Sequence, residues 1–173
     1  VTYKDSGVDW IGEIPAGWNA FKIKHIVAVP VTDGPHESPQ LVDEGIPFIS
    51  AEAVKGNKLD FSLMRGYISK EDHEVYCKKV RPQREDIFVV KSGATTGAIA
   101  IVDTDEEFSI WSPLAMVRSK KPEYIQRFVY YAMLSDSFRK QIELGWNFGT
   151  QQNIGMNVLE NLYIACPLST EVQ

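Results

Sequence analysis

Residues 87–102, IFVVKSGATTGAIAIV, are the stretch that decides how the rest of the chain is interpreted. Two β-branched runs, at 87–90 and 99–102, flank a polar connection that contains Gly93 and Gly97. Short β-branched runs joined through glycine are typical of a strand, a loop and a second strand. The sequence therefore predicts two adjacent strands that present a polar, basic loop at one end.

The loop at 91–98 holds one lysine, three hydroxyl side chains and two glycines. Because glycine permits close approach to the backbone, the N–H groups of such a loop can face an anion such as a phosphate. An ordinary hairpin with a polar tip is the alternative. A nucleotide-triphosphate loop is excluded, since Gly93 and Gly97 are too close together and Ala98 occupies the position that requires lysine.

The composition indicates one globular domain with a core, because 44% of the 173 residues are hydrophobic and 24% are charged. No apolar run approaches the roughly 20 residues of a membrane span, and the N-terminal residues lack the pattern of a signal peptide. Cys77 and Cys166 are too few for a disulfide scaffold, so we expect a reduced, cytoplasmic chain. The cysteines and histidines show no metal-ligand spacing, and we expect neither a metal nor a cofactor.

The net charge of −5 argues against a nucleic-acid partner, but the charge is unevenly distributed. Residues 55–91 carry nine basic and six acidic side chains and form the only segment with a net positive charge. A basic cluster within it consists of Lys78, Lys79, Arg81 and Arg84. The cluster is either a phosphate-facing surface or a solvated charged face.

The fold class predicted is α+β, with a mixed or antiparallel sheet of short strands and a C-terminal pair of helices packed on it. Besides the two strands above, we expect strands at 19–23, 25–31, 46–50, 114–118 and 162–166. We expect short helices at 69–76, capped by Ser69, and at 158–161, capped by Asn157.

The C-terminal helix pair is the clearest part of the prediction. Apolar residues at 125, 128, 129, 132 and 133 follow the helical period across 123–134. A second helix, capped by Ser135 or Asp136 and ending before Gly145, places Phe138 and Ile142 on one face. The apolar stripe of this αα-hairpin is expected to lie on the sheet; the alternative is a face that binds a partner.

Residues 1–18 are expected to form an irregular arm, because four glycine and proline residues interrupt it. Trp10 and Trp18 make the arm too apolar for a free tail, so we expect it to pack on a single domain at 19–168.

Two further polar loops accompany the one at 91–98. The first, TDGPHESPQ at 32–40, contains His36, Ser38 and Gln40. The second, WNFGTQQN at 146–153, ends in the residues Thr150, Gln151, Gln152 and Asn153. Side-chain amides can bind adenine through two hydrogen bonds in the major groove, although a connection or a capped turn would explain either loop. No catalytic motif is visible, so this inventory suits recognition better than catalysis.

Four segments in this order resemble the specificity (S) subunits of type I restriction–modification systems. They are KDSGVDWIGEIPAGW at 4–18, the 33–39 loop with GIPFI at 45–49, the segment at 86–102, and the run at 149–168. The resemblance implies a fold like the DNA-recognition domain of certain adenine methyltransferases. It also implies sequence-specific binding of duplex DNA by a non-catalytic subunit that serves methyltransferase (M) and restriction (R) subunits.

S subunits of this kind usually carry two recognition domains separated by long helices, and each domain reads one half of a split target. This chain holds one such domain, and residues 169–173 fall where the first long helix is expected to begin. The chain is therefore either a fragment or a half-subunit, and a half-subunit would associate with itself.

The resemblance also suggests roles for the polar side chains. Lys91, Ser92, Thr95 and Thr96 are expected to contact phosphates or nearby bases, and the basic cluster and Lys58 to add electrostatic attraction. Candidates for base edges, or for the frame that holds the readers, are His36, Ser38, Gln40, Thr150, Gln151, Gln152 and Asn153. Alternatively, the variable segments at 55–65 and 105–112 carry the specificity.

Two other functions compete with DNA reading. The first is a protein-interaction module that docks methyltransferase subunits without reading bases, supported by the net charge and by Trp10, Trp18 and Trp146. The second is an enzyme that uses His36 and Glu37 as acid and base, which requires a closed pocket and a perturbed pKa.

Overall fold

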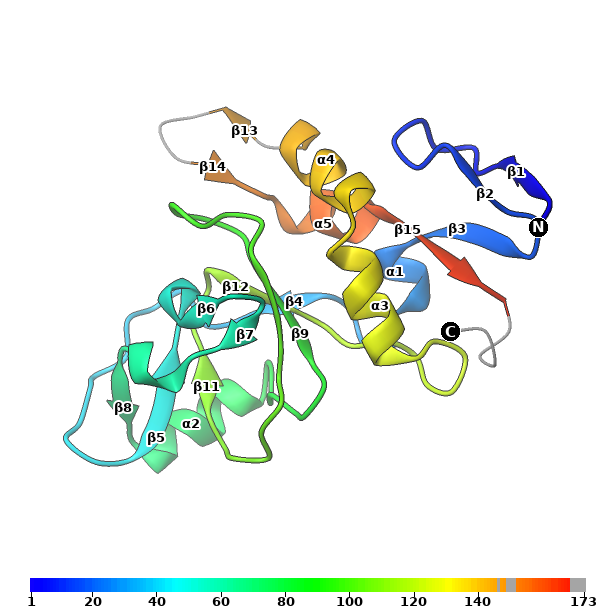
Figure 1. The fold of residues 1–173 in the computed structure, drawn as a ribbon. Coiled ribbons are helices and arrows are strands. Elements are labelled where there is room, and N and C mark those ends of the chain that lie inside the picture. Colours follow the sequence, from blue (N-terminus) through cyan, green and yellow to red (C-terminus); the bar gives the residue numbers. More distant parts are fainter. Residues whose placement is uncertain (146, 149–151, 169–173) are drawn as a thin grey trace.

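A six-stranded sheet forms the centre of the molecule in a computed structural model, which describes residues 1–145, 147–148 and 152–168 (Figure 1). The strand order is β4 (Thr32–Asp33), β12 (Leu114–Val117), β9 (Ile87–Val90), β10 (Ile99–Ile101), β7 (Lys58–Leu59) and β6 (Val54–Lys55). The β9–β10 pair is antiparallel, which confirms the strand–loop–strand prediction, whereas β10 pairs with β7 in parallel. The predicted mixed sheet of an α+β fold is confirmed.

Smaller sheets surround the central one. A three-stranded sheet joins β11 (Ser109–Ile110), β5 (Ile46–Ile49) and β8 (Gly66–Ile68), next to the helix α2 (Lys70–Cys77). Two-stranded sheets are formed by β1 (Tyr3–Asp5) with β2 (Glu13–Pro15), by β3 (Trp18–Lys22) with β15 (Tyr163–Pro167), and by β13 (Asn147–Phe148) with β14 (Gln152–Asn153). The 3₁₀ helices η1 (Ala51–Ala53) and η2 (Phe61–Leu63) flank the β6–β7 hairpin.

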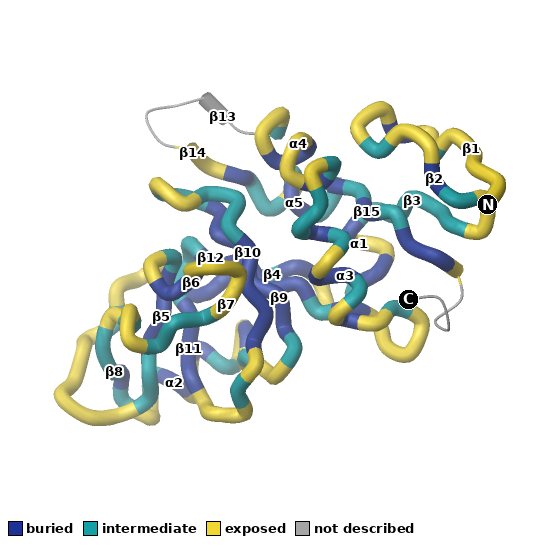
Figure 2. Tube along the Cα trace, in the orientation of Figure 1, coloured by how far each residue is buried: buried dark blue, intermediate teal, exposed yellow. Residues whose placement is uncertain are grey.

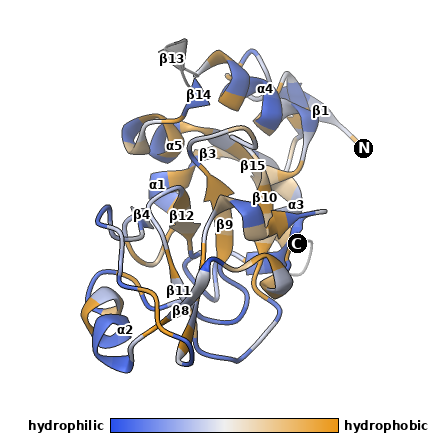
Figure 3. Cartoon of the chain, turned by 90° about the vertical axis from the view of Figure 1, so that its left-hand side faces the viewer, coloured by the Kyte–Doolittle hydropathy of each residue, from blue (hydrophilic) through white to orange (hydrophobic). Residues whose placement is uncertain are grey.

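Both faces of the central strands are buried, which explains why β9 and β10 read as continuous apolar runs rather than alternating ones (Figures 2 and 3). Ile87, Val89 and Ile99 belong to one core, covered by the helices of the C-terminal half. Phe88 and Val90 point to the opposite core, which η1, η2 and the three-stranded sheet cover. Successive side chains of β9 therefore alternate between the two cores, although all of them are apolar.

The C-terminal helix pair is confirmed as α3 (Gln126–Met133) and α4 (Asp136–Leu144), packed on the sheet. Ser135 is the N-cap of α4, and its hydroxyl accepts a hydrogen bond from the Phe138 N–H at 3.3 Å. Phe138 and Ile142 are buried against the sheet, as their spacing predicts. Helix α3 begins later than expected, with Ile125 as its N-cap.

Two local predictions beyond residue 18 are wrong. Residues 25–31 do not form a strand: His25 and Ile26 end the short helix α1 (Ile23–Ile26), which buries Ile23 and Ile26, and of the residues that follow only Val27 pairs, in an isolated bridge with Ser119. The last helix, α5 (Met156–Asn161), begins earlier than predicted and is capped by Gly155 instead of Asn157. By contrast, α2 is capped by Ser69, whose hydroxyl accepts from the Asp72 N–H at 3.0 Å, as predicted.

The division into an arm at 1–18 and a domain at 19–168 stays a prediction. The expectation that residues 1–18 are irregular is wrong, because Tyr3–Asp5 and Glu13–Pro15 pair as the antiparallel β1–β2 hairpin. The Trp18 and Phe128 rings pack edge to face with centroids 5.6 Å apart. Trp10 is 47% exposed. Within the described part of the chain, no helix combines the length and apolar character that crossing a membrane requires.

A buried histidine joins α2 to the three-stranded sheet. The His73 Nδ1 atom lies 2.8 Å from the Ser109 hydroxyl on β11, and the side chain is 1% exposed. Burial lowers the pKa of His73 below its ordinary value of 6.5, although the Glu107 carboxylate opposes this shift. The neutral imidazole is therefore the form that the folded protein stabilises.

The stability of the protein should fall as the pH drops below 6.5, because the unfolded chain then binds a proton that folded His73 resists. This one proton lowers the free energy of unfolding by at most about 1.4 kcal/mol for each pH unit below 6.5. Urea unfolding at pH 7.5 and 5.5 measures this loss, and His73→Gln should show a smaller loss than the wild type. Equal losses in the two proteins would show that His73 does not set the acid sensitivity.

Candidate functional site

The three polar loops identified in the sequence meet at Lys91, which follows β9. Its ammonium group donates to Asp33 Oδ2 at 2.6 Å, which connects it to the loop at 32–40. Its backbone carbonyl accepts from the Ile154 N–H at 2.7 Å, which connects it to the segment that follows β14. Lys91 is only 8% exposed. One residue therefore joins three loops that are far apart in the sequence.

Asp33 is the acceptor at the centre of this junction. Lys79 donates to its other carboxylate oxygen and also to the Gly34 carbonyl at 3.1 Å, and His36 Nε2 lies 3.3 Å from Oδ2. Burial alone would raise the pKa of Asp33, but the hydrogen bonds and charges of Lys79 and Lys91 more than offset this and hold the pKa below its usual value. The carboxylate is therefore charged at neutral pH, and the junction is an ionic one.

The loop at 32–40 is fixed against the sheet by close backbone contacts. Asp33 pairs with Ala115 of β12. A side chain at Gly34 would overlap the backbone of Ile110 and Trp111, so only glycine fits there. The Trp111 indole N–H donates to the Glu37 carbonyl at 3.1 Å. Sequence reasoning identified Asp33 only as part of a turn, since its lysine partners are 46 and 58 positions away.

The loop at 91–98 lies beside β14, and the two are side by side in Figure 1. Ser92 and Asn153 form an antiparallel bridge. The Thr96 hydroxyl donates to the Gly93 carbonyl at 2.7 Å and lies 3.2 Å from the Gln152 carbonyl. The tip of the loop at Thr95 is exposed. These contacts hold the loop in one conformation while leaving its tip open to a partner.

Most of the predicted loop residues are exposed, but they do not all surround Lys91. Gln40 lies two residues before Val42, which pairs with Tyr67 of β8. The residues that are exposed are His36, Ser38, Gln40, Lys58, Thr95, Gln152 and Asn153. Ser92 and Thr96 are half-buried. Thr150 and Gln151 lie outside the described residues. We call the exposed set Ser38, Gln40, Thr95, Gln152 and Asn153 the polar rim.

The basic cluster is paired with carboxylates, most of which are at least 21 positions away in the sequence. Arg81 contacts Glu74 at 2.8 Å and Glu107 at 3.2 Å, and Arg84 contacts Asp105 at 3.1 Å. Lys79 is bound to Asp33, and Lys78 is exposed. Arg84 precedes β9 whereas Lys91 follows it, so the two lie beyond opposite ends of that strand. The cluster therefore offers less free positive charge than its composition suggests.

The catalytic interpretation of His36 and Glu37 gains no support from their geometry. The imidazole of His36 is 72% exposed and faces Asp33, while Glu37 is exposed and its backbone carbonyl is bound by Trp111. Among the described residues, no three histidine, cysteine, aspartate or glutamate side chains are grouped so that they could hold a metal ion.

Residues 15–173 match the family described as the type I restriction modification DNA specificity domain, and the chain belongs to this family. The resemblance seen in the sequence is thereby confirmed. A domain of this family supplies DNA specificity and is not itself catalytic. Among curated protein sequences, none matches this chain.

Solved structures share the fold. One is a type I restriction-modification S subunit from M. genitalium, with 20% identity over 89% of this chain and a TM-score of 0.62. Another is the HsdS subunit from Thermoanaerobacter tengcongensis, with 14% identity over 96% of this chain and a TM-score of 0.62. A third, from a study of complex assembly and conformational transition in a type I R-M system, has 17% identity over 98% and a TM-score of 0.63. The chain spans 35%, 36% and 38% of these three chains respectively.

Replacing Asp33 by asparagine should destabilise the protein by about 3–5 kcal/mol, because it leaves the buried Lys91 ammonium without a counter-charge. The matched control is Asp105→Asn, which removes a carboxylate that is 78% exposed and should cost less than about 1 kcal/mol. Urea unfolding at pH 7 measures both losses. If the two variants unfold at the same urea concentration, Asp33 does not organise the junction.

Proposed function

We propose that the polar rim binds duplex DNA and reads one half of a split target sequence. The observation that carries this proposal is the junction at Lys91, which brings three loops rich in hydroxyl and amide groups together at one end of the sheet. Family membership supports DNA as the partner.

The rim residues have the chemistry that base readout requires. Gln40, Gln152 and Asn153 carry amides that can hydrogen-bond to adenine through two contacts, and Ser38 and Thr95 carry hydroxyls that accept or donate. Lys58 is exposed at the end of the β6–β7 hairpin and would contact phosphate. We therefore assign base contacts to the rim and a phosphate contact to Lys58.

Lys91 has a different role in this proposal from the direct phosphate contact that the sequence suggests. Its ammonium group is buried and already bound to Asp33. A phosphate would have to displace that carboxylate and desolvate its own charge. We assign Lys91 to positioning: its ion pair sets the relation between the loops at 32–40 and 91–98, so it acts on DNA through Ser92, Thr95 and Thr96.

The two variable segments are placed differently with respect to the rim. Residues 55–65 include the exposed turn between β6 and β7, next to the β10 strand that leaves the 91–98 loop. Residues 105–112 supply Asp105 and Glu107, which bind Arg84 and Arg81. Of the two segments, we propose that 55–65 contributes to target specificity and that 105–112 belongs mainly to the frame.

We further propose that the chain acts with methyltransferase and restriction subunits, which hold the catalytic activities, and that it works in the cytoplasm. A second function, docking of another protein without base readout, is favoured by exposed apolar side chains: Trp10 is 47% exposed, Leu144 62% and Tyr131 64%. These side chains lie outside the polar rim. The two functions are distinguished by whether the chain binds DNA by itself.

The chain should bind duplex DNA in a manner that weakens with salt, and selection from a pool of random duplexes should enrich one short sequence. Lys58→Ala should weaken binding similarly for all sequences and lower the slope of log affinity against log salt by about one. Arg84→Ala is the charge-matched control and should leave the slope unchanged, because Asp105 already offsets Arg84. Salt-dependent binding without any enriched sequence would contradict base readout, and absence of binding would favour the docking function.

A further inference from the structure

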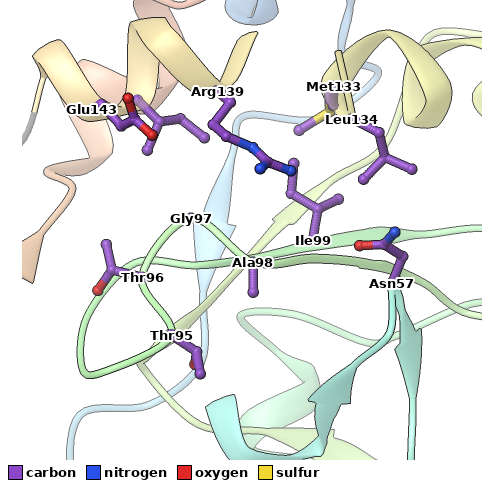
Figure 4. Close-up of a pocket in the computed structure, with 11 residues that line it drawn as sticks. Asn57, Thr95, Thr96, Gly97, Ala98, Ile99, Met133, Leu134, Arg139 and Glu143 are labelled. Atoms are coloured by element: carbon purple, nitrogen blue, oxygen red, sulfur yellow. The ribbon is translucent and has the colours of Figure 1, made fainter. Parts of the chain in front are cut away.

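A cleft of about 350 Å³ lies beside the polar rim, where four distant segments meet (Figure 4). The loop at 91–98 contributes Thr95 and Thr96, the β6–β7 turn contributes Asn57, and α4 contributes Arg139 and Glu143. Apolar side chains such as Ile99 and Met133 also line it. The prediction for the helix pair concerned its apolar stripe, for packing or for a partner, and did not identify Arg139 and Glu143 on α4 as residues of a cleft.

The walls of the cleft are held in place by contacts within the protein. The Tyr130 hydroxyl on α3 donates to the Asn57 carbonyl at 2.9 Å, which fixes the β6–β7 turn against the helix pair. On the loop side, Gly97 has a positive φ of 89°, and a Cβ there would come within 3.3 Å of Ile142 on α4. The loop and the helix are therefore in close contact, and the cleft does not depend on a ligand to shape it.

Arg139 supplies the positive charge of this cleft. Its side chain is exposed, and within the described residues no carboxylate lies close enough to form an ion pair with it. Figure 4 shows its guanidinium group extending from α4 toward Ile99, while Glu143 lies on the opposite side of Arg139 from Met133 and Leu134. In this respect Arg139 differs from Arg81 and Arg84, whose charges are offset by carboxylates.

We infer that Arg139 binds a backbone phosphate of the duplex in this cleft, next to the bases that the polar rim reads. This inference rests on the proposed DNA-binding function. Arginine suits phosphate because its planar group offers two parallel N–H donors. Asn57 and Thr95 also line the cleft, but Figure 4 shows the Thr95 side chain directed away from Arg139. Ala98 and Leu134, which are half-buried and also line the cleft, offer an apolar surface to the adjoining deoxyribose.

The shape of the cleft favours a phosphate over a base, whereas its second charge, that of Glu143, opposes phosphate binding. Phosphates project from the backbone and fit a concave site, whereas the base edges of a duplex lie at the floor of a groove. Glu143 repels a phosphate, so it limits the cleft to the end occupied by Arg139 and weakens the binding of a second one. The two side chains consequently have opposite effects on affinity.

The test compares three variants of the chain with the wild type in titrations of duplex DNA at several salt concentrations. Arg139→Ala should lower affinity about tenfold, as expected for a lost charge-assisted hydrogen bond, and should reduce the salt slope by about one. Lys140→Ala is the matched control: it removes an exposed cation of the same helix that does not line the cleft, and should change affinity by about twofold or less. Glu143→Gln should raise affinity.

The outcomes separate this inference from the proposed function. If the wild type binds with salt dependence but Arg139→Ala and Lys140→Ala behave alike, the phosphate site is wrong and the proposed function stands. If Arg139→Ala loses discrimination between sequences while keeping the wild-type slope, Arg139 contacts a base and the phosphate assignment is overturned. If the wild type does not bind, both fail. Arg139→Lys, with unfolding curves for each variant, checks that the loss follows charge and geometry rather than misfolding.

Discussion

The ion pair between Asp33 and Lys91 is the interaction on which the arrangement of the candidate site depends. Their side chains are 9% and 10% exposed, so both charges are largely removed from water. Desolvation of such a pair offsets much of its Coulomb attraction, and apolar residues of the same volume would often stabilise a fold equally well. What an apolar contact lacks is direction: the carboxylate also binds Lys79 and faces His36, and so it sets three segments in one register.

A sheet buried on both faces leaves its ends as the places where polar chemistry can gather. At one end of β9, buried Asp86 accepts from Arg118 at 2.7 and 2.8 Å, and this end is closed by structural contacts. At the other end, Lys91 is bound beneath a loop whose exposed tip carries hydroxyls and lies beside exposed amides. The same kind of ionic contact thus closes one end of the strand and supports the exposed polar loop at the other.

The sequence predicts well those features that depend on near neighbours. The two strands around 91–98, the helix pair and the caps Ser69 and Ser135 follow from periodicity and from side chains within a few residues. The strand predicted at 25–31 fails because two buried isoleucines three residues apart fit one helical turn equally well. The site is only half predictable: its loops are visible in the sequence, but the carboxylates that offset Lys79, Arg81 and Arg84 come from positions that only the fold brings close.

The net charge of the chain is a poor guide to its local contacts, because carboxylates offset some of its cations and leave others exposed. A net charge of −5 bears on long-range attraction to DNA, which extends over about one Debye length, and it does not decide whether a local contact forms. Because most of the basic cluster is offset, counterion release at that cluster contributes little to binding. Lys58 and Arg139 remain exposed, and Arg139 lines the same cleft as Thr95; in the proposed function they would fix the register of a duplex without attracting every sequence strongly. Under the proposed function, selectivity then comes mainly from hydrogen bonds to bases, because carboxylates already offset several of the basic side chains.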